Sequence, residues 1–146
     1  MWKNLLNIKM VAKALWLFSI TLAMGAQIKF EGIPNNSTLA ACESNTLTLN
    51  NQLATLIPGD TFLIPNTTFY VQGGVFAENI SDVVIQLDGT LKWSEDKKSW
   101  PYHDSGAVHE CWYMQGVHNV TFTSSGAGTL DGSGHTWWGY LSYLTI

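Results

Sequence analysis

Short runs of β-branched and aromatic residues fill the chain after residue 58, separated by glycine, proline and asparagine. Such runs lie at 61–64, 67–71, 83–87 and 117–123, and their composition and length are typical of strands. Residues 92–102, which hold Trp93 and Trp100, have the polar character of a loop. No long amphipathic helix pattern appears after residue 58. The pattern therefore predicts an all-β region.

The stretch before residue 58 has a different pattern. Residues 27–45 are polar and rich in turn formers, which indicates an irregular lead-in. A short helix is expected next, with Ser44 or Asn45 as its N-cap, because Leu49, Leu53 and Leu56 recur at helical spacing. The turn formers at 58–60 end that helix.

The chain also contains an internal repeat. Residues 80–85 align with 117–122, and Gly89-Thr90-Leu91 aligns with Gly128-Thr129-Leu130. A unit of this size cannot bury its own apolar face, so it is expected to stack on a neighbouring unit as in a solenoid. The alternative is two ordinary hairpins of a sandwich, and the repeated Gly-Thr-Leu favours the solenoid. The apolar helix would then cover the solenoid's first end.

The first 26 residues have the features of a secretory signal peptide. A basic start is followed by a short apolar run at 14–24 and by small residues at Ala23, Gly25 and Ala26. A membrane anchor would need about 20 apolar residues, and this run is nearer half that length. We expect cleavage after Gly25 or Ala26, a secreted, extracellular product, and one domain over 27–146.

The net charge of the chain after residue 26 limits the kinds of molecule that it is expected to bind. Once residues 1–26 are removed, four lysines face eleven acids, a net charge of about −7, and the chain has no arginine. Nucleic acid and anionic lipid are therefore not expected as partners, and neither is a membrane after cleavage. The same charge makes it difficult for this chain to hold a polyanionic sugar unaided.

Cysteine and asparagine patterns fit secretion. Cys42 and Cys111 are the two cysteines, and an oxidising compartment would favour a disulfide between them or between each and a cysteine elsewhere. Sequons for N-glycosylation are numerous for a chain of this length. They lie at Asn35, Asn36, Asn66, Asn79 and Asn119.

The order of these features resembles a known family. This order is similar to that of the opening coils of glycoside hydrolase family 28. It consists of a helix, a Pro-Gly-Asp turn, a strand pair, Leu-Asp-Gly-Thr-Leu, Asn-Val-Thr-Phe and then the run 128–138, with Gly-Thr-Leu-Asp-Gly-Ser-Gly and Trp-Trp. Those enzymes are polygalacturonases and their relatives, built as right-handed parallel β-helices. The resemblance covers roughly Leu47 to Tyr143, and 128–138 is its most specific part.

The resemblance implies hydrolysis of α-1,4 links between galacturonic acids with inversion, by aspartates of later coils. Those aspartates lie in Asn-Thr-Asp and Asp-Asp motifs, with Gly-His-Gly and Arg-Ile-Lys motifs beside them, and this chain contains none of the four. Inversion requires an acid and a base carboxylate about 6.5–9.5 Å apart. We therefore assign no catalytic residue to this chain.

Several residues were weighed as local candidates. Asp131 is interpreted as a turn residue that bonds its own backbone, because glycines flank the motif. Trp137 and Trp138 could form a sugar-stacking platform, but packing of at least one over the helix flank is favoured. Asp82 and Asp88 are interpreted as turn residues at the two ends of a strand.

A metal site is not predicted. His103, His109 and Cys111 match no standard zinc spacing. Glu110 is a weak acid–base partner for His109, because adjacent residues on a strand face opposite ways.

Together these observations predict about three coils of right-handed parallel β-helix behind a capping helix. The chain is interpreted as the N-terminal part of a secreted, polygalacturonase-like glycosidase that acts on pectin-type polysaccharide and is monomeric at full length, without cofactors. Alone it is expected to be inactive, poorly stable and prone to aggregate. The alternatives are a non-catalytic carbohydrate-binding module that uses Trp137, Trp138 and Tyr140, and a pectin-lyase-like lyase or epimerase.

Overall fold

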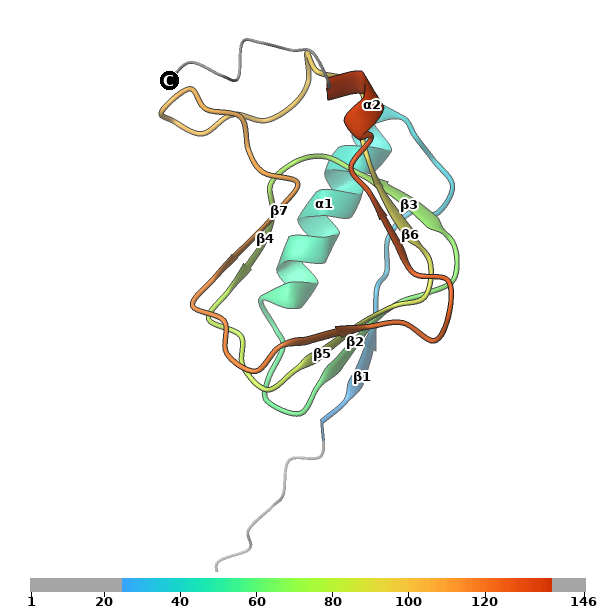
Figure 1. Cartoon of the computed structure of the whole chain (residues 1–146), viewed down its shortest axis with the longest axis vertical. Coiled ribbons are helices and arrows are strands. Elements are labelled where there is room, and N and C mark those ends of the chain that lie inside the picture. The colour runs from blue at the N-terminus through green and yellow to red at the C-terminus, as the bar shows by residue number, and fades with distance from the viewer. Residues whose placement is uncertain (1–24, 138–146) are drawn as a thin grey trace, which may run out of the picture.

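The computed structural model describes residues 25–137, and strands dominate this part of the chain (Figure 1). Helix is limited to the 15-residue α1 and the 4-residue α2. The predicted all-β character is therefore supported. In chain order the elements are β1 (Gln27–Lys29), α1 (Leu39–Leu53), β2 (Thr61–Ile64), β3 (Thr68–Val71), β4 (Val75–Glu78), β5 (Val84–Leu87), β6 (Thr90–Trp93), β7 (Trp112–Gln115), β8 (Thr121–Thr123), β9 (Thr129–Asp131) and α2 (Gly134–Trp137).

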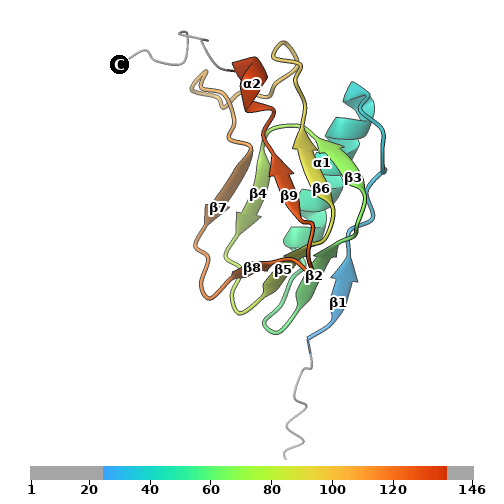
Figure 2. The ribbon, with the colours of Figure 1, turned by 45° about the vertical axis from the view of Figure 1, so that its right-hand side comes forward.

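The strands form three parallel sheets, ordered β1-β2-β5-β8, β3-β6-β9 and β4-β7. Each pass of the chain adds one strand to each sheet in turn: β2, β3 and β4 make one pass, and β5, β6 and β7 make the next. β8 and β9 then extend the first two sheets. Neighbours within a sheet therefore come from successive passes, and Figure 2 shows these passes side by side.

The internal repeat predicted from the sequence is confirmed at the level of strand register. Val84 pairs with Thr121 and Ile85 with Phe122, as the alignment of 80–85 with 117–122 requires. In the next sheet Thr90 pairs with Thr129, as the Gly-Thr-Leu alignment requires. The repeat is therefore the stacking unit of the sheets and not a pair of hairpins.

The glycine of each Gly-Thr-Leu has a steric cause. A Cβ at Gly89 would collide with the carbonyl oxygens of Pro65 and Thr67 in the preceding pass. A Cβ at Gly128 would collide in the same way with the carbonyl oxygen of Leu87. Any side chain at these corners would push the passes apart, so the stacking itself selects glycine there.

Inward-facing residues stack in columns through the passes. Phe62 pairs with Ile85, and Ile85 with Phe122. Phe62 and Ile85 are fully buried, whereas Phe122 in the last pass is 45% exposed. Leu91 and Leu130 repeat this contrast in the β3-β6-β9 sheet, at 0% and 52% exposed. The described part of the chain therefore has a covered end and an open end.

Helix α1 lies at the covered end, packed on β3 and β4 (Figures 1 and 2). Leu49 and Leu53 are fully buried in the core, as the helical spacing predicted. The predicted N-cap was wrong: the helix begins at Leu39, and the Thr38 hydroxyl accepts a hydrogen bond from the Ala41 amide. Leu56 is buried but lies beyond the helix, which ends at Leu53.

Two further details differ from the sequence interpretation. The lead-in is not wholly irregular, because β1 pairs with β2 through Ile28 and Phe62. The loop after β6 begins later than residue 92, since Lys92 and Trp93 belong to that strand. None of the helices within residues 25–137 has the length and hydropathy that a bilayer crossing requires. The signal peptide expected at 1–26 lies almost wholly outside the described residues.

Candidate functional site

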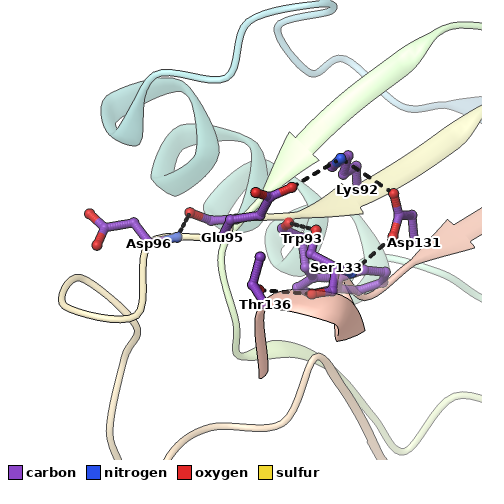
Figure 3. A network of polar contacts seen from close by, with 8 residues as sticks. Lys92, Trp93, Glu95, Asp96, Asp131, Ser133 and Thr136 are labelled. Carbon is purple, nitrogen blue, oxygen red and sulfur yellow. Dashed lines mark hydrogen bonds and ion pairs between the residues drawn. The ribbon is translucent and has the colours of Figure 1, made fainter. Parts of the chain in front are cut away.

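The described part of the most specific run, residues 128–137, contains β9 and α2 and lies beside the end of β6 (Figure 3). Lys92 and Asp131 pair across these two strands, which places their side chains side by side on one face. The Lys92 ammonium lies 3.5 Å from an Asp131 carboxylate oxygen and 3.2 Å from one of Glu95. We call these three residues the Lys92 site.

Asp131 also forms the turn predicted for it. Its Oδ1 accepts the backbone N–H of Ser133 at 2.9 Å. The buried Ser133 hydroxyl donates to the carbonyl of Trp93 at 2.8 Å, and the Thr136 hydroxyl donates to the carbonyl of Ser133 at 2.8 Å. These bonds tie the start of α2 to the end of β6. The turn role of Asp131 is confirmed, and its pairing with Lys92 was not anticipated.

The electrostatics of the Lys92 site favour neutral ligands. The hydrogen bond that the Lys92 ammonium donates to Glu95, reinforced by the charge of Asp131, raises the pKa of Lys92. One ammonium therefore faces two carboxylates, and their excess negative charge opposes the binding of an acidic sugar. A hollow of about 390 Å³ adjoins the site. Its lining consists of Ser37, Cys42, Tyr70, Lys92, Trp93, Ser94, Glu95 and Asp96.

The aromatic platform is only partly within the described residues. Trp137 is half-buried and meets the buried Trp100 edge-on, with ring centroids 4.8 Å apart. The Lys97 ammonium lies 5.6 Å from the centre of the Trp137 ring. Trp137 therefore packs against the fold, as favoured from the sequence, while Trp138 and Tyr140 lie outside the described residues.

A second polar cluster involves residues that the sequence analysis set aside. His103 Nε2 lies 3.1 Å from Glu110 Oε2, and the rings of His103 and His109 are 3.7 Å apart between centroids. One possible ligand atom of each of the three residues lies within 4.8 Å of the others. The hydrogen bonds from its own backbone N–H and from His103 lower the pKa of Glu110. The sequence interpretation grouped the two histidines with Cys111, whereas the structure places Glu110 beside them.

Both cysteines are free thiols in the structure. The Cys42 thiol is buried in α1 and donates to the Ser37 carbonyl, whereas Cys111 is half-buried near Gly132. Burial raises the pKa of each thiol. The predicted bridge between Cys42 and Cys111 is therefore not present.

The sequon asparagines stay candidates for glycosylation. Asn36 is half-buried, and its side-chain Oδ1 accepts the backbone N–H of Thr38. The other four are exposed. They are Asn35, Asn66, Asn79 and Asn119.

The turn aspartates behave as structural acceptors. Asp82 has a φ of 55° and accepts the side-chain N–H of Asn119 at 2.8 Å, so two equivalent turns of successive passes are joined. Asp88 accepts the Ser125 N–H at 2.7 Å, and this bond lowers its pKa. The pKa values of Asp96 and Glu110 are lowered as well. A general acid needs a raised carboxyl pKa, so these groups are poor candidates for that role.

Comparison with known proteins identifies one informative relative. The chain is 30% identical over 93 residues to the alpha-L-rhamnosidase rgxB of Aspergillus niger, which covers 61% of this chain and 21% of the relative. The chain therefore spans about a fifth of the length of the curated relative it matches. No protein-family model matches, and no solved structure matches. The partial match indicates a glycosidase-like relationship.

Proposed function

We propose that this chain is the N-terminal part of a secreted, polygalacturonase-like glycoside hydrolase with a right-handed parallel β-helix fold. The observation that carries the proposal is the stack of three parallel sheets, in which every described strand pair is parallel and the Gly-Thr-Leu corners lie in register. The partial similarity to an alpha-L-rhamnosidase supports a glycosidase as the parent activity. Pectin-type polysaccharide is the proposed substrate.

The chemistry of this chain supports a scaffold role. The described carboxylates with the clearest contacts accept backbone N–H groups: Asp60 from Ala26, Asp88 from Ser125 and Asp131 from Ser133. Hydrolysis with inversion needs instead an acid and a base aimed at one sugar bond. The catalytic carboxylates are therefore proposed to come from coils beyond residue 146.

The gene itself offers the most direct test. Reading the genomic sequence past the Ile146 codon is expected to give further coils with Asn-Thr-Asp and Asp-Asp motifs. An arginine with clustered calcium-ligand acids in their place would contradict the hydrolase and favour a lyase. The complete product should release reducing sugar from polygalacturonan or rhamnose from an α-L-rhamnoside, and the 146-residue chain should release neither. Hydrolysis by the short chain would contradict its role as a scaffold.

Secretion has a separate test, because the two proposed cleavage positions would affect the contacts of Ala26 differently. Ala26 donates its N–H to Asp60 Oδ1 at 2.8 Å, and its carbonyl accepts the Thr61 N–H at 2.9 Å. Asp60 is only 2% exposed, and its Oδ2 accepts the Ile57 N–H. Cleavage after Gly25 would turn the Ala26 nitrogen into an ammonium that keeps this contact as a charge-assisted bond.

Cleavage after Ala26 would instead remove both bonds and leave Asp60 Oδ1 without the Ala26 N–H. We therefore expect the mature chain to begin at Ala26. Intact-mass measurement of protein recovered from the medium of a secreting eukaryotic host, after enzymatic removal of N-glycans, checks this. A chain that begins at Gln27 would contradict the cleavage position, and retention of the chain in the cells with residues 1–26 attached would contradict secretion.

A further inference from the structure

The second polar cluster lies on a small hairpin that the loop after β6 forms. Tyr102 and Val108 make an antiparallel bridge, and the His103 N–H donates to the Ala107 carbonyl at 2.8 Å. The turn closes at Gly106, where φ is +82° and the N–H donates to the His103 carbonyl. This pairing sets the register of the two arms.

That register brings the two histidines to one face. Residue 103 lies opposite 107, so His109 is the diagonal neighbour of His103 across the hairpin, within reach of a long or aromatic side chain. The ring centroids are 3.7 Å apart with the planes tilted by 32°. Glu110 then completes the group through its 3.1 Å contact with His103 Nε2.

The base of the hairpin is fixed to the core. The ring N–H of the buried Trp100 donates to the His109 carbonyl at 2.8 Å. The Gly74 N–H donates to the Glu110 carbonyl at 2.8 Å, directly before β4. The backbone that carries two of the three side chains is therefore anchored. The side chains themselves stay accessible, at 39% exposure for His103 and 51% for Glu110.

We propose that His103, His109 and Glu110 form a binding site for a divalent ion of the zinc type. Two imidazoles and one carboxylate are a donor set that Zn²⁺ accepts, with a fourth position left for water. With metal–ligand distances of about 2.0–2.2 Å, ligand atoms in a tetrahedral site lie about 3.3 Å apart. The His103–Glu110 contact already has nearly this separation, and the limit of 4.8 Å for the whole group requires only small rotations of two half-buried histidines and the exposed Glu110.

The donor set also predicts selectivity. Ca²⁺ and Mg²⁺ bind through oxygen ligands, and this cluster offers one carboxylate. Imidazole donors favour Zn²⁺ and Cu²⁺ over those ions. The metal-site proposal does not depend on the proposed glycosidase function, because it rests only on the contacts of His103, His109 and Glu110.

Titration calorimetry with Zn²⁺ alone, on the full chain purified without a polyhistidine tag, tests the proposal. Wild-type protein is expected to bind one equivalent, and Ca²⁺ at the same concentration is expected to give no binding. His103→Ala, His109→Ala and Glu110→Gln should each weaken Zn²⁺ binding at least about tenfold. Far-UV circular dichroism verifies that each variant keeps its fold, which is expected because the altered side chains lie on an exposed hairpin.

Two matched variants make the result specific. His118 is an exposed histidine outside the cluster, so His118→Ala should bind Zn²⁺ as the wild type does. Cys111→Ser should also leave the affinity unchanged, because the cluster does not include this thiol. Absence of Zn²⁺ binding by the wild type would overturn the proposal. Equal losses in the cluster variants and in either control would overturn it as well.

Discussion

Asn45 links α1 to the chain segments on both of its sides. Its side chain is fully buried; Oδ1 accepts the Ile33 N–H at 2.6 Å, and Nδ2 donates to the carbonyls of Ile33 and Tyr70 at 3.0 and 2.9 Å. Asn45→Ala removes all three bonds. At about 1 kcal/mol of net stability for each bond, the loss is about 3 kcal/mol. Alanine is the better helix former by up to about 0.7 kcal/mol, which leaves a destabilisation of roughly 2 kcal/mol.

Urea unfolding followed by tryptophan fluorescence measures this loss, at low protein concentration so that association is minimal. Asn51→Ala is the matched control, because Asn51 is exposed on the same helix and undergoes the same change in helix propensity. It should gain a few tenths of a kcal/mol. The difference between the two variants isolates the three hydrogen bonds from the propensity of the helix.

Asn45→Asp sharpens the test. It keeps an acceptor for the Ile33 N–H but removes the donor and turns a buried charge towards the carbonyls of Ile33 and Tyr70. It should therefore be less stable than Asn45→Ala. Equal unfolding midpoints for Asn45→Ala and Asn51→Ala would falsify the inference that the Asn45 hydrogen bonds to Ile33 and Tyr70 stabilise the fold.

Three further outcomes are expected. Gly128→Ala should lower the free energy of unfolding by about 1–3 kcal/mol in a urea titration, because the added Cβ meets the backbone of the preceding pass. Gly126→Ala is the control, and its free energy of unfolding should change little because a Cβ at this position projects into open space. The lowered pKa of Asp88 means that its charged form adds stability above pH 4 or so, and that this contribution is lost as the pH falls through its folded pKa. The urea midpoint of Asp88→Asn should therefore fall less than that of the wild type between pH 6 and pH 3. The open edges of β8 and β9 should make residues 26–146 associate as concentration rises in sedimentation velocity, and Leu130→Gln should reduce this association. A cooperative, monomeric melt would contradict this expectation.

The sequence predicts the strand register well in the segments that contain the internal repeat. Residues 80–85 and 117–122 can be aligned without a structure because stacked passes impose the same inward residues and the same corner glycine. The four-residue β4 and β7 have no such marker, although Val75 pairs with Trp112 in the same way. Each has four residues, the lower limit at which alternation is informative.

Local signals failed where tertiary contacts compete with them. Asn45 is a good N-cap residue by type, yet its amide is used for three bonds between segments in the middle of the helix. The cap is Thr38, whose sequence context appeared irregular. The grouping of His103 with His109 and Glu110 depends on the register of a hairpin closed at Gly106, and comparison of sequence neighbours does not reveal it.

The polar side chains of 128–137 indicate why a specific motif need not mark an active site. Asp131 bonds the Ser133 N–H and faces Lys92, Ser133 bonds the Trp93 carbonyl, and Thr136 bonds the Ser133 carbonyl. Each of these contacts helps to fix the path of the chain from β9 into α2 beside the end of β6. A substitution here would disturb the stacking before it affected a substrate. The motif is therefore specific because the geometry of this corner is demanding.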